Sequence, residues 1–417
     1  MAKSLWIINQ YETTSDTGLA GRYYQLAEIL SSRGYEVCVI SAAFTHIMHK
    51  PVELSSWCEI EKRGKLNWVW INMPKYSHAH SKKRIFNWLL FSMRLLKLLS
   101  VKTIKKPNVI IASTPSPFVY IGAKYLANKS RAKFIFDVRD IWPLSLCEIG
   151  NISRNNPLIW LMQKLEDRAY SKSDAITSNL PKAEVHINSR VNGSAPFYWL
   201  PNGIRIKNIA NKVKVALPAS LEKENIFKVG YAGTIGEANE LLTFVKAAKL
   251  LNGYSDILIV LIGQGKNKEQ LQNYIKDNGL SNVEFINPVP KSHVVTLLQK
   301  LDVCYIGLTR SSVFRFGVAP NKLFDYFFAA RPIIYAIDSG SYLPVNEAGA
   351  GISIPPGDPK KLAEAILELK KMSKIERDVM GKSGREYVLK YHDYEKIADK
   401  LENILNYVTS KNSERKQ

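Results

Sequence analysis

Acidic residues are missing from a long stretch of this chain. Between Lys62 and Lys133 there are 16 Lys or Arg and no Asp or Glu, and the next acid is Asp137. Most of the formal net charge of +21 therefore lies in one part of the N-terminal half. Such a region attracts nucleic acid, an anionic membrane surface or phosphorylated substrates, although a merely solvated basic face would look the same.

Other features that are absent narrow the class of protein further. No apolar run reaches the length of about 18 residues that a spanning helix needs, so none is predicted. The N-terminus MAKSLWIIN has no apolar run that ends in a small-residue cleavage site, so we predict no signal peptide. The four cysteines are scattered and form no CxxC, which makes a reducing cytoplasm the default.

One segment within the acid-free stretch combines apolar and basic residues. Residues 83–106 read as a helix on which Ile85, Trp88, Leu89, Leu96 and Leu99 share one face. A basic amphipathic helix of this kind can lie in a membrane interface, but a core-facing helix with a basic outer face is the alternative. For the membrane reading, the predicted contacts are Lys83, Arg84, Trp88, Arg94 and Lys97.

Short apolar runs alternate with helical stretches along the whole chain, and this pattern predicts parallel sheets covered by helices. The alternation runs from LWIIN at 5–9 to about residue 200, and restarts with KVGYAG at 228–233 after a polar connector at 203–225. We predict an α/β fold with two Rossmann-like doubly wound domains. The predicted parts are a first domain at 1–203, a second domain at 204–388, and a C-terminal helix with a polar tail at 389–417.

Two glycine-rich turns follow predicted strands of the second half. Gly230-Tyr231-Ala232-Gly233-Thr234-Ile235-Gly236 is the first, and Gly263-Gln264-Gly265 is the second, with Lys268 close behind. Glycine lets backbone N–H groups approach a phosphate, and a following helix N-terminus favours an anion. Each turn alone is a weak signal, because a plain tight turn has the same composition.

The segment Pro320-Asn321-Lys322-Leu323-Phe324-Asp325-Tyr326 is more specific. Proline opens a helix here, so Lys322 falls in the first turn, where a cation is unfavourable unless an anion binds. A bound phosphate would resolve this conflict, although a solvated lysine is the simpler alternative. Asp325 follows one turn later, placed to accept hydrogen bonds from a ribose or a sugar.

In this order, GYAGTIG, IGQG and PNKLFDYFFAARPII resemble family 4 of the retaining glycosyltransferases, most of all the O-antigen and capsule branch that includes N-acetyl-L-fucosamine transferases. The first half agrees through NQYETTSDTGLAGRYYQLAEIL, FDVRDIWPLSL and WLPNGI, so the resemblance covers about residues 4–400. It implies a cleft enzyme of the GT-B fold, with the two domains facing across the cleft. In that fold the first domain (1–203) would bind the acceptor, the second (204–388) would bind the nucleotide sugar, and the C-terminal helix (389–417) would pack back on the first domain.

The resemblance also implies roles for individual residues. Asp325 would hold the ribose, and the others predicted to bind the donor are Gly18, Gly233, Thr234, Gly236, Gly263, Gly265, Lys268, Arg315, Pro320, Asn321, Lys322 and Leu323. Residues predicted to bind the acceptor are Gly21, Arg22, Arg139, Asp140 and Trp142, and those predicted to be catalytic are Arg139, Asp140 and Lys322. Alternatively, Arg139 and Asp140 form a salt bridge and Trp142 is simply packed.

The chain departs from the family pattern at three positions. Gly317 stands where relatives often carry the first of two glutamates, and Thr234 and Glu240 replace a usual Arg and Lys of the first loop. The diphosphate charge must therefore be met by other cations, for which Lys322, Arg315 and Lys268 are the candidates. No D-x-D motif occurs, so we predict that no metal or other cofactor is needed.

We therefore predict a retaining glycosyltransferase that uses a nucleotide-diphosphate sugar, with UDP as the expected nucleotide, and a polyprenyl-diphosphate-linked saccharide in O-antigen or capsule synthesis. Its predicted place is cytoplasmic and peripheral, on the inner face of the bacterial plasma membrane. A sugar-nucleotide epimerase is one alternative, although no histidine adjoins a motif. A nucleic-acid-binding protein is the other, but the basic stretch is Leu-rich rather than aromatic and basic in alternation. The sequence names neither the donor sugar nor the linkage.

Overall fold

A computed structural model describes residues 4–76, 81–206 and 218–410, and its contacts divide the chain into two compact units. The first contains residues 1–202 and 394–417, and the second contains Gly203–Asp393. The first predicted boundary, at 203, thus lies within one residue of this division. The second, at 388, falls inside a helix that stays with the second unit. Much of the predicted connector (207–217) and nearly all of the predicted tail (411–417) lie outside the described residues.

The first unit is built on a sheet with the strand order β3-β4-β2-β1-β5-β6-β7-β8. Its strands pair in parallel, except that β3 is antiparallel to β4. The strands are β1 (Ser4–Ile8), β2 (Glu36–Ala42), β3 (Cys58–Arg63), β4 (Leu66–Ile71), β5 (Val109–Ser113), β6 (Lys133–Val138), β7 (Ala175–Ser178) and β8 (Phe197–Trp199). The helices are α1 (Arg22–Ser32), α2 (Lys82–Leu95), η1 (Leu98–Ser100), α3 (Val119–Ser130), α4 (Leu144–Glu148), α5 (Pro157–Lys172), α6 (Ala183–Arg190) and α15 (Tyr394–Ser410).

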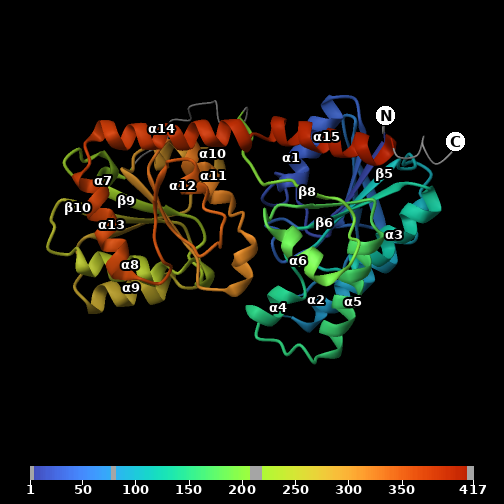
Figure 1. The fold of residues 1–417 in the computed structure, drawn as a ribbon, viewed down its shortest axis with the longest axis horizontal. Coiled ribbons are helices and arrows are strands. Elements are labelled where there is room, and N and C mark those ends of the chain that lie inside the picture. The colour runs from blue at the N-terminus through green and yellow to red at the C-terminus, as the bar shows by residue number, and fades with distance from the viewer. Residues whose placement is uncertain (1–3, 77–80, 207–217, 411–417) are drawn as a thin grey trace. The chain divides into compact units, whose positions relative to one another are not determined.

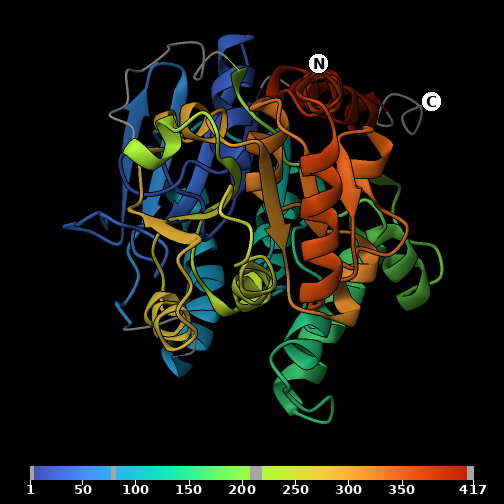
Figure 2. The ribbon, with the colours of Figure 1, turned by 90° about the vertical axis from the view of Figure 1, so that its left-hand side faces the viewer.

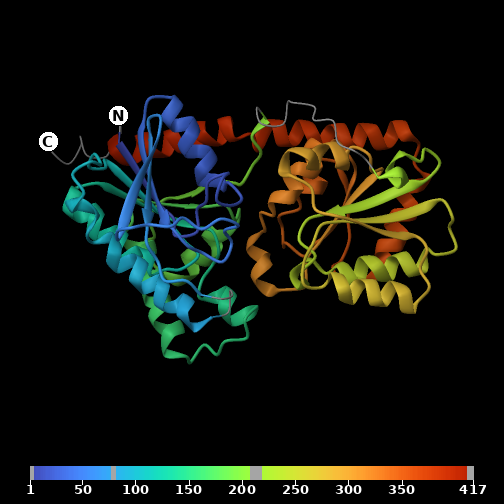
Figure 3. The ribbon, with the colours of Figure 1, turned by 180° about the vertical axis from the view of Figure 1, so that it is seen from behind.

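Helices cover this sheet on both faces, as Figures 1 and 3 show. The buried side chains of α1 and α15 form one core with β1, β2 and β4, which includes Leu26 and Leu30 of α1 and Leu401 and Leu405 of α15. On the other face, a second cluster joins α2 to the start of α3 and to α5. Nowhere in the described residues is a helix both long and apolar enough to cross a membrane.

The second unit has a parallel sheet with the order β11-β10-β9-β12-β13-β14. The strands are β9 (Phe227–Ala232), β10 (Ile257–Ile262), β11 (Val283–Ile286), β12 (Val303–Gly307), β13 (Ile333–Ala336) and β14 (Gly351–Ser353). The helices are α7 (Ala219–Glu222), η3 (Glu237–Asn239), α8 (Leu241–Leu250), α9 (Lys268–Asp277), α10 (Lys291–Leu298), η4 (Ser312–Phe316), α11 (Asn321–Phe328), α12 (Pro344–Glu347), α13 (Pro359–Lys371) and α14 (Lys374–Tyr391).

Two cores lie on the two faces of this sheet (Figures 1 and 2). One contains α8, α9 and α13, and the other contains α10, α11, α12 and α14. Because β10 and β12 both pair with β9, the order of the strands reverses at β9, and ligands of such sheets bind outside the carboxyl ends at the reversal. The predicted class, α/β with two Rossmann-like domains, is confirmed.

Candidate functional site

At the carboxyl edge of the second sheet, the turns after β9 and β10 pack against each other. Gly233 N–H donates to the Ile262 carbonyl at 2.9 Å, and Ile235 N–H donates to the Gln264 carbonyl at 2.8 Å. A Cβ on Gly263 would lie 2.0 Å from the Gly233 carbonyl oxygen, and one on Gly265 would lie 2.2 Å from that of Ile235. The close packing of the two turns thus explains both glycines of the second turn. The sequence analysis interpreted these glycines only as phosphate contacts.

Lys322, at the start of α11, reaches into the first of these turns. Its Nζ donates to Tyr231 Oη and to Asn239 Oδ1, both at 2.6 Å, and it lies 4.4 Å from the Tyr231 ring centroid. Burial lowers the pKa of Lys322 to about 7. A Cβ on Gly233 would lie 3.1 Å from this Nζ, so the glycine leaves space beside the amine. Among the described residues, the partners of this amine are neutral oxygens and a ring, and no carboxylate forms an ion pair with it.

Asp325 lies one turn further along α11 and is buried. Its carboxylate forms an ion pair with Lys291, the first residue of α10. Desolvation raises the pKa of Asp325, while Lys291 lowers it. The residue predicted to hold a ribose is therefore already bound to a cation, and Lys291 is a neighbour of the site that the sequence did not reveal.

The remaining predicted donor residues are spread along the same edge. Lys268 lies over the Phe285 ring at 5.6 Å, and the exposed Arg315 lies over the Phe316 ring at 4.3 Å. Leu323 is buried in the core, so its side chain is not available to a ligand, which corrects the prediction for this side chain. Thr234 and Asn321 are exposed, and Pro320 and Gly236 are half-buried. In the first unit, Gly18 is packed against Thr13, whose Oγ1 would lie 2.8 Å from an added Cβ.

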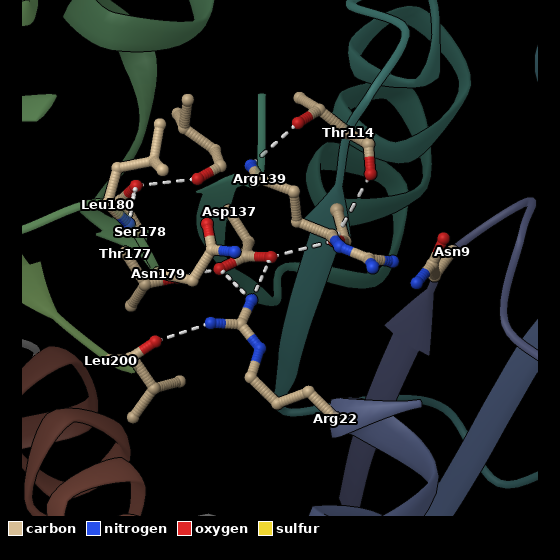
Figure 4. A network of polar contacts seen from close by, with 12 residues as sticks. Asn9, Arg22, Thr114, Asp137, Arg139, Thr177, Ser178, Asn179, Leu180 and Leu200 are labelled. Carbon is tan, nitrogen blue, oxygen red and sulfur yellow. Dashed lines mark hydrogen bonds and ion pairs between the residues drawn. The ribbon is translucent and has the colours of Figure 1, made fainter. Parts of the chain in front are cut away.

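A buried ion pair lies at the carboxyl ends of β5, β6 and β7 in the first unit (Figure 4). Asp137 accepts hydrogen bonds from Arg22 at 2.7 Å, from Thr177 at 2.8 Å and from Ser113 at 2.7 Å. Arg22 also donates to the Leu200 carbonyl and is only 4% exposed. The prediction that Arg22 binds the acceptor is therefore corrected, because its guanidinium is enclosed and occupied by Asp137 and Leu200.

Next to this pair lies a second buried acid, Glu12, which the sequence analysis did not single out. Its carboxylate accepts hydrogen bonds from Asn9 Nδ2 at 2.7 Å and from Tyr24 N–H at 3.2 Å. Desolvation raises the pKa of Glu12, and the half-buried Arg139 opposes this effect. A Cβ on Gly21 would lie 2.2 Å from Glu12 Oε1, so Gly21 is needed to make room for this carboxylate.

Aromatic rings surround Arg84 at the same edge. Its Nε donates to Tyr11 Oη at 2.9 Å, and its Cζ lies 5.4 to 5.5 Å from the ring centroids of Tyr11, Trp88 and Trp142. Trp88 is 5% exposed and packs edge-on against Trp142. Arg84 and Trp88 were predicted to contact a membrane, and this is wrong for their side chains, because they lie on the inward face of α2.

The outward face of α2 consists of other residues. Phe86, Leu89, Met93 and Leu96 are 37% to 64% exposed and recur at helical spacing. Of the cations predicted to contact a membrane, Lys83 and Lys97 are exposed here, and Arg94 is half-buried. The helix is therefore apolar on two opposite faces. The sequence analysis predicted only one apolar face and so placed residues of both faces together.

Comparisons with known proteins agree with this architecture. Residues 215–387 match the family model described as "Glycosyl transferases group 1". "Probable glycosyltransferase WbjE" of Pseudomonas aeruginosa is 20% identical over 316 residues, which are 73% of this chain and 76% of that protein. "Putative colanic acid biosynthesis glycosyl transferase WcaI" of Escherichia coli K12 is 23% identical over 317 residues, 74% of this chain and 76% of that protein.

The fold itself is shared with solved structures. Anabaena HepE, solved in complex with UDP and glucose, superposes with a TM-score of 0.66 at 12% identity, covering 97% of this chain and 100% of its own. Likenesses of this kind establish the GT-B fold. The family match over residues 215–387 and the two glycosyltransferase relatives support the glycosyltransferase that the sequence motifs predicted.

Proposed function

We propose that this glycosyltransferase moves a sugar, such as an N-acetylated deoxyhexosamine or a hexose, from a UDP-linked donor to a polyprenyl-diphosphate-linked saccharide. The product belongs to a surface polysaccharide, either O-antigen or capsule. The observation that carries the proposal is Lys322, a half-buried residue with a lowered amine pKa, which lies at the start of a helix and at the carboxyl edge of a parallel sheet. It forms no ion pair with a carboxylate of the described residues.

The placement of this amine supports a diphosphate as its partner. Lys322 lies at the strand reversal beside β9, where ligands of doubly wound sheets bind, and a helix N-terminus favours an anion. Anabaena HepE, which has the same fold, was solved with UDP, and WcaI is described as a colanic acid biosynthesis enzyme. The first supports UDP as the nucleotide, and the second supports a surface polysaccharide as the product.

In the proposed reaction, the enzyme stabilises the negative charge that grows on the departing diphosphate. Lys322 and backbone N–H groups at the start of α11 would supply this stabilisation from fixed positions. Retention at the anomeric carbon follows from the family resemblance, with the leaving phosphate taking the acceptor's proton on the same face of the sugar. We propose no metal, because the sequence has no D-x-D.

A thermal-shift screen tests the donor assignment. UDP and UDP-sugars are expected to raise the melting temperature more than other nucleoside diphosphates, because only the donor's base and diphosphate fit together. Adding EDTA should leave both the shift and sugar transfer unchanged. If a different nucleoside diphosphate stabilised the protein, the proposed base would be wrong but the proposed enzyme class would stand. If none of them stabilised it, the proposal would be contradicted.

The outward face of α2 fits the second part of the proposal, a peripheral place on an anionic membrane. Phe86, Leu89, Met93 and Leu96 present apolar surface beside Lys83 and Lys97. Such a helix can lie in the interface, and each basic residue near the surface adds about 1 kcal/mol. The occupant that combines apolar contact with negative charge is the anionic leaflet.

Phe86→Ser together with Met93→Ser should weaken binding to vesicles that contain phosphatidylglycerol by at least about tenfold, because two exposed apolar side chains no longer enter the interface. Flotation of the protein with such vesicles measures this binding. The matched control is Ile375→Ser with Val379→Ser on α14, which removes equally exposed apolar side chains from the second unit. Equal flotation of both double variants, or no preference for anionic lipid in the unmodified protein, would rule out this surface.

A further inference from the structure

The two faces of α2 have different surroundings, since one is exposed and the other contacts an aromatic cluster. Arg84 and Met93 are nine residues apart, which is two and a half turns, so they lie on opposite sides of the helix. Met93 is 64% exposed on the outward face described above. Arg84 is half-buried on the inward face and points into the aromatic cluster at the carboxyl edge of the first sheet. A ligand held by Arg84 would therefore lie one helix diameter away from the proposed lipid surface.

Arg84 is held in one orientation by its surroundings. Tyr11 Oη accepts hydrogen bonds from both Arg84 Nε and Trp88 Nε1, at 2.9 and 2.8 Å. The rings of Tyr11, Trp88 and Trp142 pack around the guanidinium. A guanidinium fixed in this way loses little conformational freedom when it binds an anion, and its planar fork matches two oxygens of a phosphate.

A second guanidinium, that of Arg139, belongs to the same edge of the first sheet. Arg139 and the exposed Asp140 lie three and two residues before Trp142, whose ring centroid is 5.5 Å from the Arg84 guanidinium, and Trp142 N–H donates to the Asp140 carbonyl at 3.0 Å. The other nearby acid, Glu12, is buried, has both oxygens in hydrogen bonds, and has a raised pKa. Arg84 and Arg139 therefore bring two guanidinium groups to this edge of the first sheet.

We propose that Arg84 and Arg139 bind the diphosphate through which the acceptor saccharide is attached to its lipid. This inference rests on the proposed function, since it assumes a lipid-diphosphate acceptor, and it assigns the acceptor's anionic group to named residues. Helix α2 then serves both parts of that substrate, with the lipid surface on its outward face and the diphosphate on its inward face. The aromatic rings beside Arg84 would pack against the first sugar or the first isoprene unit.

Binding of farnesyl diphosphate, measured by calorimetry with UDP at saturation, tests the assignment. Saturating UDP occupies the donor site, so the probe reports only the second diphosphate site. Arg84→Gln is expected to raise the dissociation constant about ten- to a hundredfold, as expected for the loss of a charge-assisted hydrogen bond. Arg84→Lys should lose less affinity for farnesyl diphosphate, because the charge remains. Arg139→Gln should lose as much affinity as Arg84→Gln.

Two controls separate this role from a merely structural one. Lys129→Gln, an exposed cation on the neighbouring helix α3, should bind farnesyl diphosphate as the unmodified protein does, and farnesol should bind all variants equally. UDP affinity and the near-UV circular dichroism spectrum of Arg84→Gln should be unchanged. The inference is overturned if Arg84→Gln binds farnesyl diphosphate normally, if it loses UDP affinity to the same extent, or if the unmodified protein binds UDP but not farnesyl diphosphate. A protein that binds no nucleotide would instead overturn the proposed function.

Discussion

Replacing Lys322 with methionine is expected to weaken UDP binding about a hundredfold at neutral pH. The ammonium group is the buried cation at the start of α11, and methionine fills similar space without a charge. Isothermal titration with UDP measures the loss. The fold should not suffer, because the desolvated amine is itself a cost to the free protein, so the melting temperature of the variant without ligand should not fall.

The pH dependence of binding gives a second readout of the same residue. The pKa of Lys322 is about 7 in the free protein, and a bound diphosphate would raise it, so binding takes up a proton above that pH. UDP affinity should therefore be highest at or below pH 7, and it should fall by up to about tenfold per pH unit from about pH 7 to about pH 9. In this range the nucleotide phosphates stay ionised and do not contribute.

Through Lys322, a rise in pH should affect protein stability and UDP affinity in opposite directions. Burial lowers the pKa of Lys322 from 10.5, so the unfolded chain holds this proton more tightly than the folded one. Below pH 7 the buried charge lowers the free energy of unfolding by its full amount. This loss of stability becomes smaller as the pH rises from 7 towards 10.5. Lys322→Arg, whose charge does not titrate, should remove the pH dependence of UDP binding. A flat pH profile in the unmodified protein, or normal affinity in Lys322→Met, would show that this amine does not bind the diphosphate.

Much of the fold could be predicted because the strands are nearly continuous apolar runs. LWIIN at 5–9 and KVGYAG at 228–233 appear as β1 and β9, each with limits one residue from the predicted ones. The strand β3, with the sequence CEIEKR, was missed because it is a polar edge strand that pairs only with β4. Helix α2 is shorter than predicted, since beyond Leu95 tertiary contacts hold the chain, such as the hydrogen bond from Trp6 Nε1 to the Lys105 carbonyl.

The site could be predicted only where its chemistry is local. The conflict between Lys322 and the helix N-terminus can be read from seven consecutive residues, and the structure places that amine at the sheet edge. In contrast, Arg22 and Asp137 are 115 residues apart, and Arg84 and Tyr11 are 73 apart, so their pairing depends on the fold. The one local signal for Asp137 was an acid at the end of the apolar strand KFIFDV, where a buried charge requires a partner.

Replacing Asp137 with alanine is expected to destabilise the first unit by about 3–5 kcal/mol, because it leaves Arg22 as an unpaired charge in the core. It also removes the acceptor for Thr177 and Ser113. Urea unfolding followed by tryptophan fluorescence measures the loss in this unit alone. All eight tryptophans lie in the first unit, at positions 6, 57, 68, 70, 88, 142, 160 and 199.

A matched surface pair separates this effect from the loss of any ion pair. Lys105→Gln breaks an exposed pair with Glu36 and should cost less than about 1 kcal/mol. The double variant Arg22→Met with Asp137→Leu should recover most of the stability, since it removes both charges and leaves apolar side chains in their place. UDP should still stabilise the second unit of Asp137→Ala, because Lys322 is untouched. If Asp137→Ala cost no more than Lys105→Gln, the buried pair would not be what holds α1 against the ends of β6 and β7, and Arg22 would again be a candidate for binding the acceptor.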